Sequence, residues 1–169
     1  ILADLSTIDA AIAIDDRTVK AGSEMTYAAG VTDYFGAKNA TLNVFDGGVI
    51  WLDDPSVNYS DIRTIDASDC LDDVTLAGSA RNELLLGGRG ANTFAYTGGR
   101  DTIEGANDDD AIFLLGIGLD EITSIDVDDA AIEMRFANGG RLKLEGAADV
   151  AYNIEGAEYK LDRASKTLK

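Results

Sequence analysis

The chain has 169 residues, of which 46% are hydrophobic, a composition that allows a single domain with a substantial apolar core. Its 31 Asp and Glu outnumber its 14 Lys and Arg, and the net charge of −17 argues against nucleic acid as a partner. There is no His, which removes the commonest general base, and the single Cys excludes an internal disulfide. No run of residues approaches the roughly 18 apolar positions that a membrane-spanning helix requires.

Residues 1–61 predict irregular β coils. Short strands are marked there by apolar residues at alternate positions, namely Ile8, Ile12 and Ile14, and then Leu42 and Val44. Asp46-Gly47-Gly48 turns the chain into the next apolar run at 49–52, either as a hairpin or as a sharp corner. Apolar spacings up to residue 76 are wider and less regular than those that follow, so we expect wider coils in this part.

Residues 62–116 contain a nine-residue repeat. Four consecutive nonapeptides can be written out, GSARNELLL (78–86), GGRGANTFA (87–95), YTGGRDTIE (96–104) and GANDDDAIF (105–113). The eighth position is always a large apolar residue, and the sixth is always an acid or an amide. A period of nine is neither helical nor that of a simple strand. It predicts a turn of about six residues followed by a short strand, so that two units form one full coil of a parallel β-roll.

The spacing also predicts where the side chains lie. Large apolar residues nine positions apart should line the inside of the coil, and we expect the glycine and acid corners to stack outside. The apolar residues concerned are Leu76, Leu85, Phe94, Ile103 and Ile112.

These nonapeptides resemble the hemolysin-type calcium-binding repeat family, the RTX proteins, whose unit is G-G-x-G-x-D-x-U-x. GGRGANTFA matches every position except the sixth, where Asn92 replaces the Asp. YTGGRDTIE keeps Gly99, Asp101 and Ile103 but lacks the first glycine pair. The stretch from Asp101 to Gly116 is similar to the acidic segment that closes such arrays.

The resemblance implies Ca²⁺ bound between turns that lie one full coil, or 18 residues, apart. One implied site joins Glu83 to Asp101, and a second joins Asn92 to Asp110, with Asp108 nearby. Carboxylates and turn carbonyls supply the oxygen ligands that Ca²⁺ prefers. Both sites depart from the family pattern, because Asn92 lacks the charge and Glu83 is one methylene longer than Asp. Arginines in or beside the turns offer an alternative, in which a guanidinium replaces the ion; they are Arg81, Arg89 and Arg100.

Residues 117–169 change in pattern and predict an antiparallel β cap followed by a basic tail, within the same continuous domain. Asn138-Gly139-Gly140 separates two alternating apolar runs, which is a strong hairpin signal. A cap is needed because an open coil end exposes unpaired strand edges and apolar interior. The tail carries Lys160, Arg163, Lys166 and Lys169; we expect a frayed terminus, with docking on the acidic face of another copy as the alternative.

The fold expected from these patterns is all-β, a parallel β-roll or β-solenoid with an antiparallel C-terminal cap. The function expected is that of a non-catalytic, calcium-binding structural module of a secreted or surface-anchored bacterial protein, such as an adhesin, a surface-layer component or a filament subunit. The family resemblance implies an extracellular location. Self-association or contact with neighbouring modules of a parent protein is the expected partnership.

The alternative is a β-helix protein that binds or cleaves polysaccharide. Cleavage would need a carboxylate pair, and no Asp or Glu pair is singled out by its spacing. Binding would need an aromatic platform, for which Trp51, Tyr27, Tyr34 and Tyr59 are the candidates, although core packing accounts for most aromatic residues.

Overall fold

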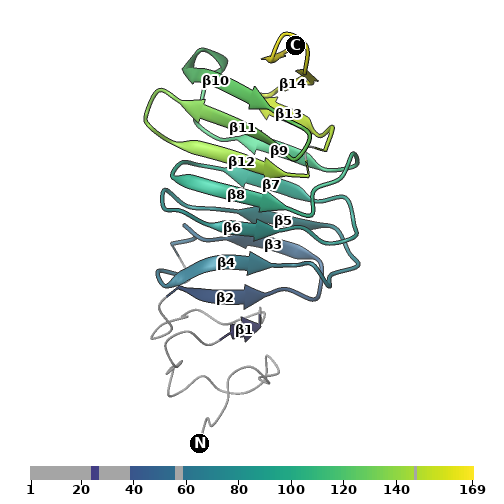
Figure 1. The fold of residues 1–169 in the computed structure, drawn as a ribbon. Coiled ribbons are helices and arrows are strands. Elements are labelled where there is room, and N and C mark those ends of the chain that lie inside the picture. The colour runs from purple at the N-terminus through teal and green to yellow at the C-terminus, as the bar shows by residue number, and fades with distance from the viewer. Residues whose placement is uncertain (1–23, 27–38, 56–58, 147) are drawn as a thin grey trace, which may run out of the picture.

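A computed structural model describes residues 24–26, 39–55, 59–146 and 148–169. The described residues form an all-β structure of two large sheets, whose strands are mostly parallel, and one small sheet (Figure 1). The predicted all-β class is therefore confirmed. The strand expected around Ile8, Ile12 and Ile14 lies outside the described residues.

The first sheet has eight strands. In spatial order they are β1 (Glu24–Thr26), β2 (Ala40–Asn43), β4 (Ile62–Asp66), β6 (Leu84–Leu86), β8 (Arg100–Glu104), β12 (Arg141–Glu145), β11 (Ala131–Phe136) and β10 (Ile122–Val127). The second sheet has six strands, in the order β14 (Ala157–Tyr159), β13 (Ala151–Ile154), β9 (Ala111–Leu114), β7 (Thr93–Tyr96), β5 (Val74–Ala77) and β3 (Gly48–Trp51). A short 3₁₀ helix, η2 (Leu119–Glu121), precedes β10.

From β2 to β9, consecutive strands alternate between the two sheets, so each strand pairs in parallel with the next strand but one. Over the nonapeptides this step is 18 residues, and Leu85 pairs with Ile103 while Phe94 pairs with Ile112. These side chains are fully buried between the sheets, as the nine-residue spacing predicts. Burying each large apolar side chain contributes roughly 1.5–3 kcal/mol.

Between β2 and β5 the same alternation occurs with longer steps. Leu42 pairs with Ile65, 23 residues later, and Ile50 pairs with Leu76, 26 residues later. Paired strands are therefore further apart in sequence here than over the nonapeptides. Because β2 and β3 belong to different sheets, the turn at Asp46-Gly47-Gly48 is a corner and not a hairpin.

The predicted hairpin at Asn138-Gly139-Gly140 is present and joins β11 to β12 in antiparallel register. Antiparallel pairs also link β10 to β11 and β13 to β14. However, β12 pairs in parallel with β8, and β13 pairs in parallel with β9. The C-terminal strands thus extend both large sheets, and the β10–β11 pair is added at the edge of the first.

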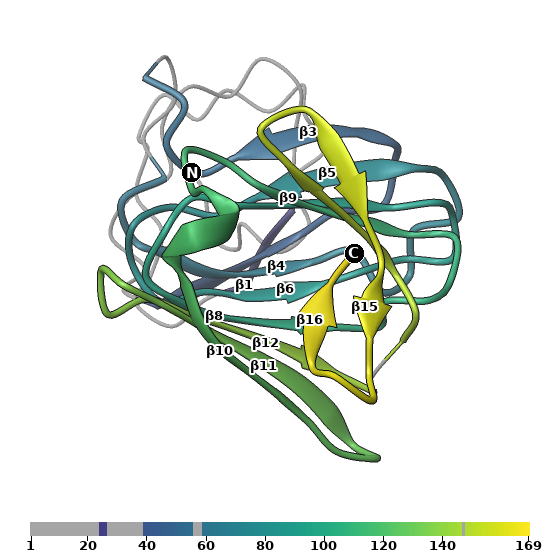
Figure 2. The same ribbon diagram turned by 90° about the horizontal axis from the view of Figure 1, so that it is seen from above.

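The C-terminal tail was expected to fray, and the structure corrects this. Residues 161–168 form a small hairpin of β15 (Leu161–Asp162) and β16 (Thr167–Leu168). Reciprocal backbone hydrogen bonds between Lys160 and Lys169 close its open end. Leu161 and Leu168 are buried against the core, so the hairpin lies across the C-terminal end of the two sheets (Figure 2).

Candidate functional site

The sixth residue of each nonapeptide sits where a turn enters a strand, and all four of these residues are buried. Relative exposures of Glu83, Asn92, Asp101 and Asp110 are between 0% and 3%. The expectation that the acid corners stack outside is therefore wrong for the sixth position. A buried carboxylate is tolerated only with hydrogen-bonding partners. The Glu83 side chain finds them within its own turn, whereas Asp101 and Asp110 bind backbone groups 18 residues earlier. Asn92 Oδ1 and Asp101 Oδ2 are buried without a hydrogen bond.

Asn92 and Asp110 form one stack of polar side chains across an 18-residue step. Asp110 Oδ1 accepts hydrogen bonds from the backbone N–H of Asn92 at 2.6 Å and from Asn92 Nδ2 at 3.2 Å. Asn92 Nδ2 also donates to the carbonyl oxygens of Gly88 and Gly90, each at 3.0 Å. Three oxygens therefore converge on one amide nitrogen. The nitrogen has to face them, because the amide oxygen would be repelled by three acceptors.

Glu83 and Asp101 form the equivalent stack nine residues earlier. Asp101 Oδ1 accepts a hydrogen bond from the backbone N–H of Glu83 at 2.9 Å. The Glu83 carboxylate is bound by Ser79, whose hydroxyl donates to Oε1 at 2.6 Å and whose backbone N–H donates to Oε2 at 3.2 Å. Arg81 Nε lies 3.4 Å from Glu83 Oε1, so the guanidinium places a positive charge beside this carboxylate.

One oxygen of this stack has no partner. Asp101 Oδ2 is buried without a hydrogen bond, and a methyl group placed on Gly78 would lie 2.9 Å from it and 3.5 Å from Glu83 Oε2. Gly78 thus faces two carboxylate oxygens from residues that are 18 positions apart in the sequence. Burial raises the pKa of Asp101 to about 8; the hydrogen bond from the Glu83 N–H opposes the rise, and the Glu83 carboxylate adds to it.

The pKa of Asp110 is also raised by burial. Here the hydrogen bonds from Asn92 and from the backbone N–H of Asn107 favour the charged carboxylate and oppose the rise. The two stacks therefore share a register but differ in electrostatics. Two carboxylates face each other in the Glu83–Asp101 stack, whereas an amide donor neutralises the Asn92–Asp110 stack.

Asp108 does not join the second stack in the structure. Its side chain is exposed, and Asp108 Oδ1 accepts a hydrogen bond from the backbone N–H of Asp149 at 3.0 Å. Asp108 thereby links the last nonapeptide to the segment before β13. Within the described residues, no group of three or more Asp, Glu, Cys or His side chains is arranged to hold a metal ion.

A second row of contacts, at the fifth position, was missed by the sequence analysis. Asp73 Oδ1 accepts a hydrogen bond from the N–H of Ala91 at 2.8 Å, and Asn82 Oδ1 accepts one from the N–H of Arg100 at 3.0 Å. Both span 18 residues and are exposed. Fifth-position side chains accept hydrogen bonds from backbone groups 18 residues later in the chain. Asp101 and Asp110, at the sixth position, accept them from backbone groups 18 residues earlier. The sequence did offer a signal for these contacts, because short polar residues, Asp73 and Asn82, occur nine positions apart.

Of the four aromatic residues considered for a carbohydrate platform, two lie in the described part of the chain, and these two differ in burial. Tyr59 is buried in the core, and Trp51 is exposed on β3. Tyr27 and Tyr34 lie outside the described residues.

No family model, curated protein or solved structure matches this chain. A helix able to span a membrane is not found among the described residues.

Proposed function

We propose that this chain is a non-catalytic, calcium-binding structural module of the β-roll type, from a secreted or surface-anchored bacterial protein. The proposal that it is a β-roll rests on the alternation of strands between two parallel sheets with an 18-residue step. The similarity of its nonapeptides to RTX repeats is consistent with that step, because two nine-residue units complete one coil.

The observation that carries the calcium proposal is the Glu83–Asp101 stack. Asp101 Oδ2 has no partner and faces a neighbouring carboxylate at a place where Gly78 has no side chain. Two like charges held together in a buried site favour either a retained proton or a bound cation. Oxygen ligands of this kind suit a hard cation, and Ca²⁺ tolerates irregular coordination.

The Asn92–Asp110 stack does not fit an ion. Its three converging oxygens are already occupied by the amide nitrogen of Asn92, which supplies the positive end of a dipole where a cation would otherwise be required. We therefore propose a single ion per chain, held by Glu83 and Asp101, with Arg81 competing for the same carboxylates.

Calorimetric titration of the chelator-treated full chain with Ca²⁺ tests this assignment. We expect Ca²⁺ binding and a higher melting temperature for the wild type, because binding to the folded state alone stabilises it. Asp101→Asn should abolish both effects. Asp110→Asn is the matched change in the other stack and should leave Ca²⁺ binding in place. Absence of heat and of any melting shift in the wild type would remove the calcium role.

A further inference from the structure

Three arginines form a row on the outer face of the first sheet, across the adjacent strands β8, β12 and β11 (Figure 1). Arg141 pairs in register with Arg100 on one side and with Arg135 on the other, and we call these three residues the arginine row. Their strand neighbours Met134 and Leu142 are buried, so the arginines point outward. Three of the eight arginines of this acidic chain thus lie side by side. Like charges at directly opposed positions repel one another, which favours an anion between them.

The carboxylates nearby neutralise the arginine row only in part. Glu133 Oε1 accepts hydrogen bonds from Arg135 Nε at 2.9 Å and Nη2 at 2.6 Å, and Glu133 Oε2 lies 3.4 Å from Arg141 Nη1. Asp126 is more distant, at 3.9 Å from Arg135. Among the described residues no carboxylate pairs with Arg100, and Arg141 Nε is buried without a hydrogen bond. Two guanidiniums therefore share one close carboxylate, and the third has none in this part of the chain.

A pocket of about 380 Å³ is lined by the arginine row, Glu133, Thr123 and the turn between β11 and β12. Its volume is within the range of roughly 300–1,000 Å³ that small-molecule sites occupy. Three arginines and one glutamate give its lining a formal charge of +2. A methyl group placed on Gly139, in the turn, would meet no atom within 4 Å, so the pocket is open on that side.

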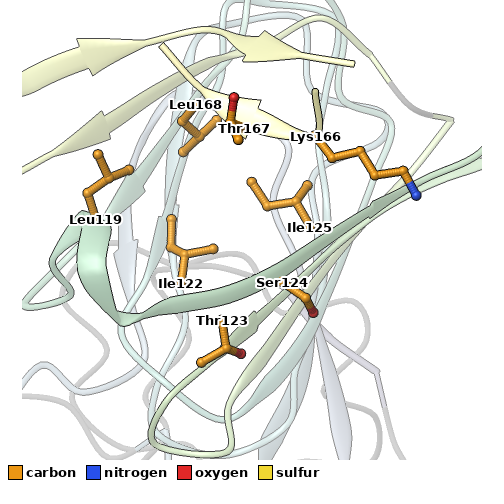
Figure 3. Close-up of a pocket in the computed structure, with 8 residues that line it drawn as sticks. All are labelled: Leu119, Ile122, Thr123, Ser124, Ile125, Lys166, Thr167 and Leu168. Carbon is orange, nitrogen blue, oxygen red and sulfur yellow. The ribbon is translucent and has the colours of Figure 1, made fainter. Parts of the chain in front are cut away.

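A second pocket, of about 390 Å³, lies between β10 and the β15–β16 hairpin and differs in charge (Figure 3). Its lining mixes apolar side chains such as Leu119 and Ile125 with hydroxyl groups such as that of Ser124. Lys166 is the one charged residue that lines it, and Lys166 Nζ lies 3.9 Å from Asp126 Oδ1. The arginine row is the stronger candidate for a ligand, because part of its charge has no partner among the described residues.

We propose that the arginine row binds a small, doubly charged oxyanion, with the chemistry that sulfate and phosphate share. Guanidiniums bind such groups through paired, charge-assisted hydrogen bonds, and neighbouring strands about 4.8 Å apart allow one oxyanion to contact two arginines. A charge of −2 matches the +2 of the lining. The net charge of −17 disfavours a polyanion, whereas a small ion is governed by charges within a Debye length of about 8 Å. The inference goes beyond the proposed structural role and does not depend on Ca²⁺.

NMR titration of the ¹⁵N-labelled full chain tests the site, with chelator present and ionic strength held constant with sodium chloride. Sodium sulfate and sodium phosphate should each shift the backbone amide signals of the arginine row in a saturable way, and their relative affinities decide between the two ions. Sodium acetate should bind roughly tenfold more weakly, because it carries one charge and fewer acceptor oxygens. Shifts in the wild type that never saturate, or equal affinities for sulfate and acetate, overturn the inference.

Variants separate the site from a general effect of salt. Arg100→Gln should lower sulfate affinity roughly tenfold, because a charged donor is lost. Arg89→Gln is the matched control at an exposed arginine outside the pocket and should bind as the wild type does. Glu133→Gln removes the competing carboxylate and should raise sulfate affinity by roughly fivefold. Circular dichroism melting checks that the variants fold. Equal losses for Arg100→Gln and Arg89→Gln, or weaker binding by folded Glu133→Gln, contradict the assignment.

Discussion

The Glu83–Asp101 and Asn92–Asp110 stacks occupy equivalent positions nine residues apart, and each buries a carboxylate with a different set of neighbours. In both, a sixth-position side chain accepts a hydrogen bond from the backbone N–H that lies 18 residues earlier. In one stack the earlier residue is Asn92, whose amide neutralises the site. In the other it is Glu83, and a second carboxylate remains close to the unpaired Asp101 Oδ2.

One functional group at the sixth position thus decides whether the buried carboxylate needs a further neutralising partner. An amide nitrogen satisfies the surrounding oxygens without help, whereas a carboxylate at the same place requires a proton, a cation or an arginine. Exchanging these groups between the two stacks should therefore exchange their properties.

The largest effect is expected from Asn92→Asp, which turns the second stack into a pair of carboxylates. Without Ca²⁺ at pH 7, we expect the free energy of unfolding to fall by about 3 kcal/mol, because a buried charge would face three oxygens. Added Ca²⁺ should restore much of this loss. Denaturant unfolding with chelator and with Ca²⁺ measures both changes.

Asn82→Asp is the matched control, because it makes the same chemical change at an exposed fifth position. It should alter stability by no more than about 0.5 kcal/mol. Equal losses for the two variants would contradict the account, since burial and the converging oxygens would then play no part.

The next largest effect is expected in how the free energy of unfolding varies with pH. Burial and Glu83 raise the pKa of Asp101 from 3.8 to about 8, so the folded state holds a proton that the unfolded state releases. The resulting stabilisation is fully present below pH 3.8 and is lost as the pH rises to about 8.

Asp101→Asn keeps an oxygen acceptor for the Glu83 N–H and adds an amide donor, which makes this stack similar to the other. Stability should then vary less with pH between 4 and 8, as followed by denaturant unfolding at several pH values. An unchanged slope would place the titrating group elsewhere.

The smallest changes in stability are expected from removing one acceptor at the buried sixth position or one at the exposed fifth position. Asp110→Ala leaves the backbone N–H groups of Asn92 and Asn107 without partners and should cost about 2 kcal/mol. Asp73→Ala removes an exposed contact to Ala91, which water can replace, and should cost about 0.5 kcal/mol. Thermal unfolding of the two variants provides the comparison. Similar losses would indicate that the two rows contribute alike.

Much of the fold could be predicted from local periodicity. The nine-residue spacing identified buried side chains that pair between parallel strands, such as Leu85 with Ile103. The Asn138-Gly139-Gly140 turn identified the β11–β12 hairpin. Both features depend on residues close together in sequence, where spacing and turn chemistry carry the information.

Other features depend on contacts that no local pattern encodes. Strand β12 pairs in parallel with β8, so that Leu142 lies beside Asp101. Strands β9, β10 and β11 lie between them in the sequence, and the nine-residue spacing does not continue through them. Burial of the sixth-position acids was missed because acidic residues usually face solvent. The backbone partners of Asp101 and Asp110 lie 18 residues earlier, where no local pattern reveals them. The residues of both candidate stacks were identified by the repeat, but Ser79 and the fifth-position row were not.

We propose that Asp101 holds a proton at the same place where Ca²⁺ would bind. Proton release on adding Ca²⁺ to the chelator-treated protein in weakly buffered solution at pH 7 measures this exchange directly. The account predicts that protons are released together with Ca²⁺ binding in the wild type and that none are released by Asp101→Asn. Calcium binding without proton release, or equal release by both proteins, would contradict it.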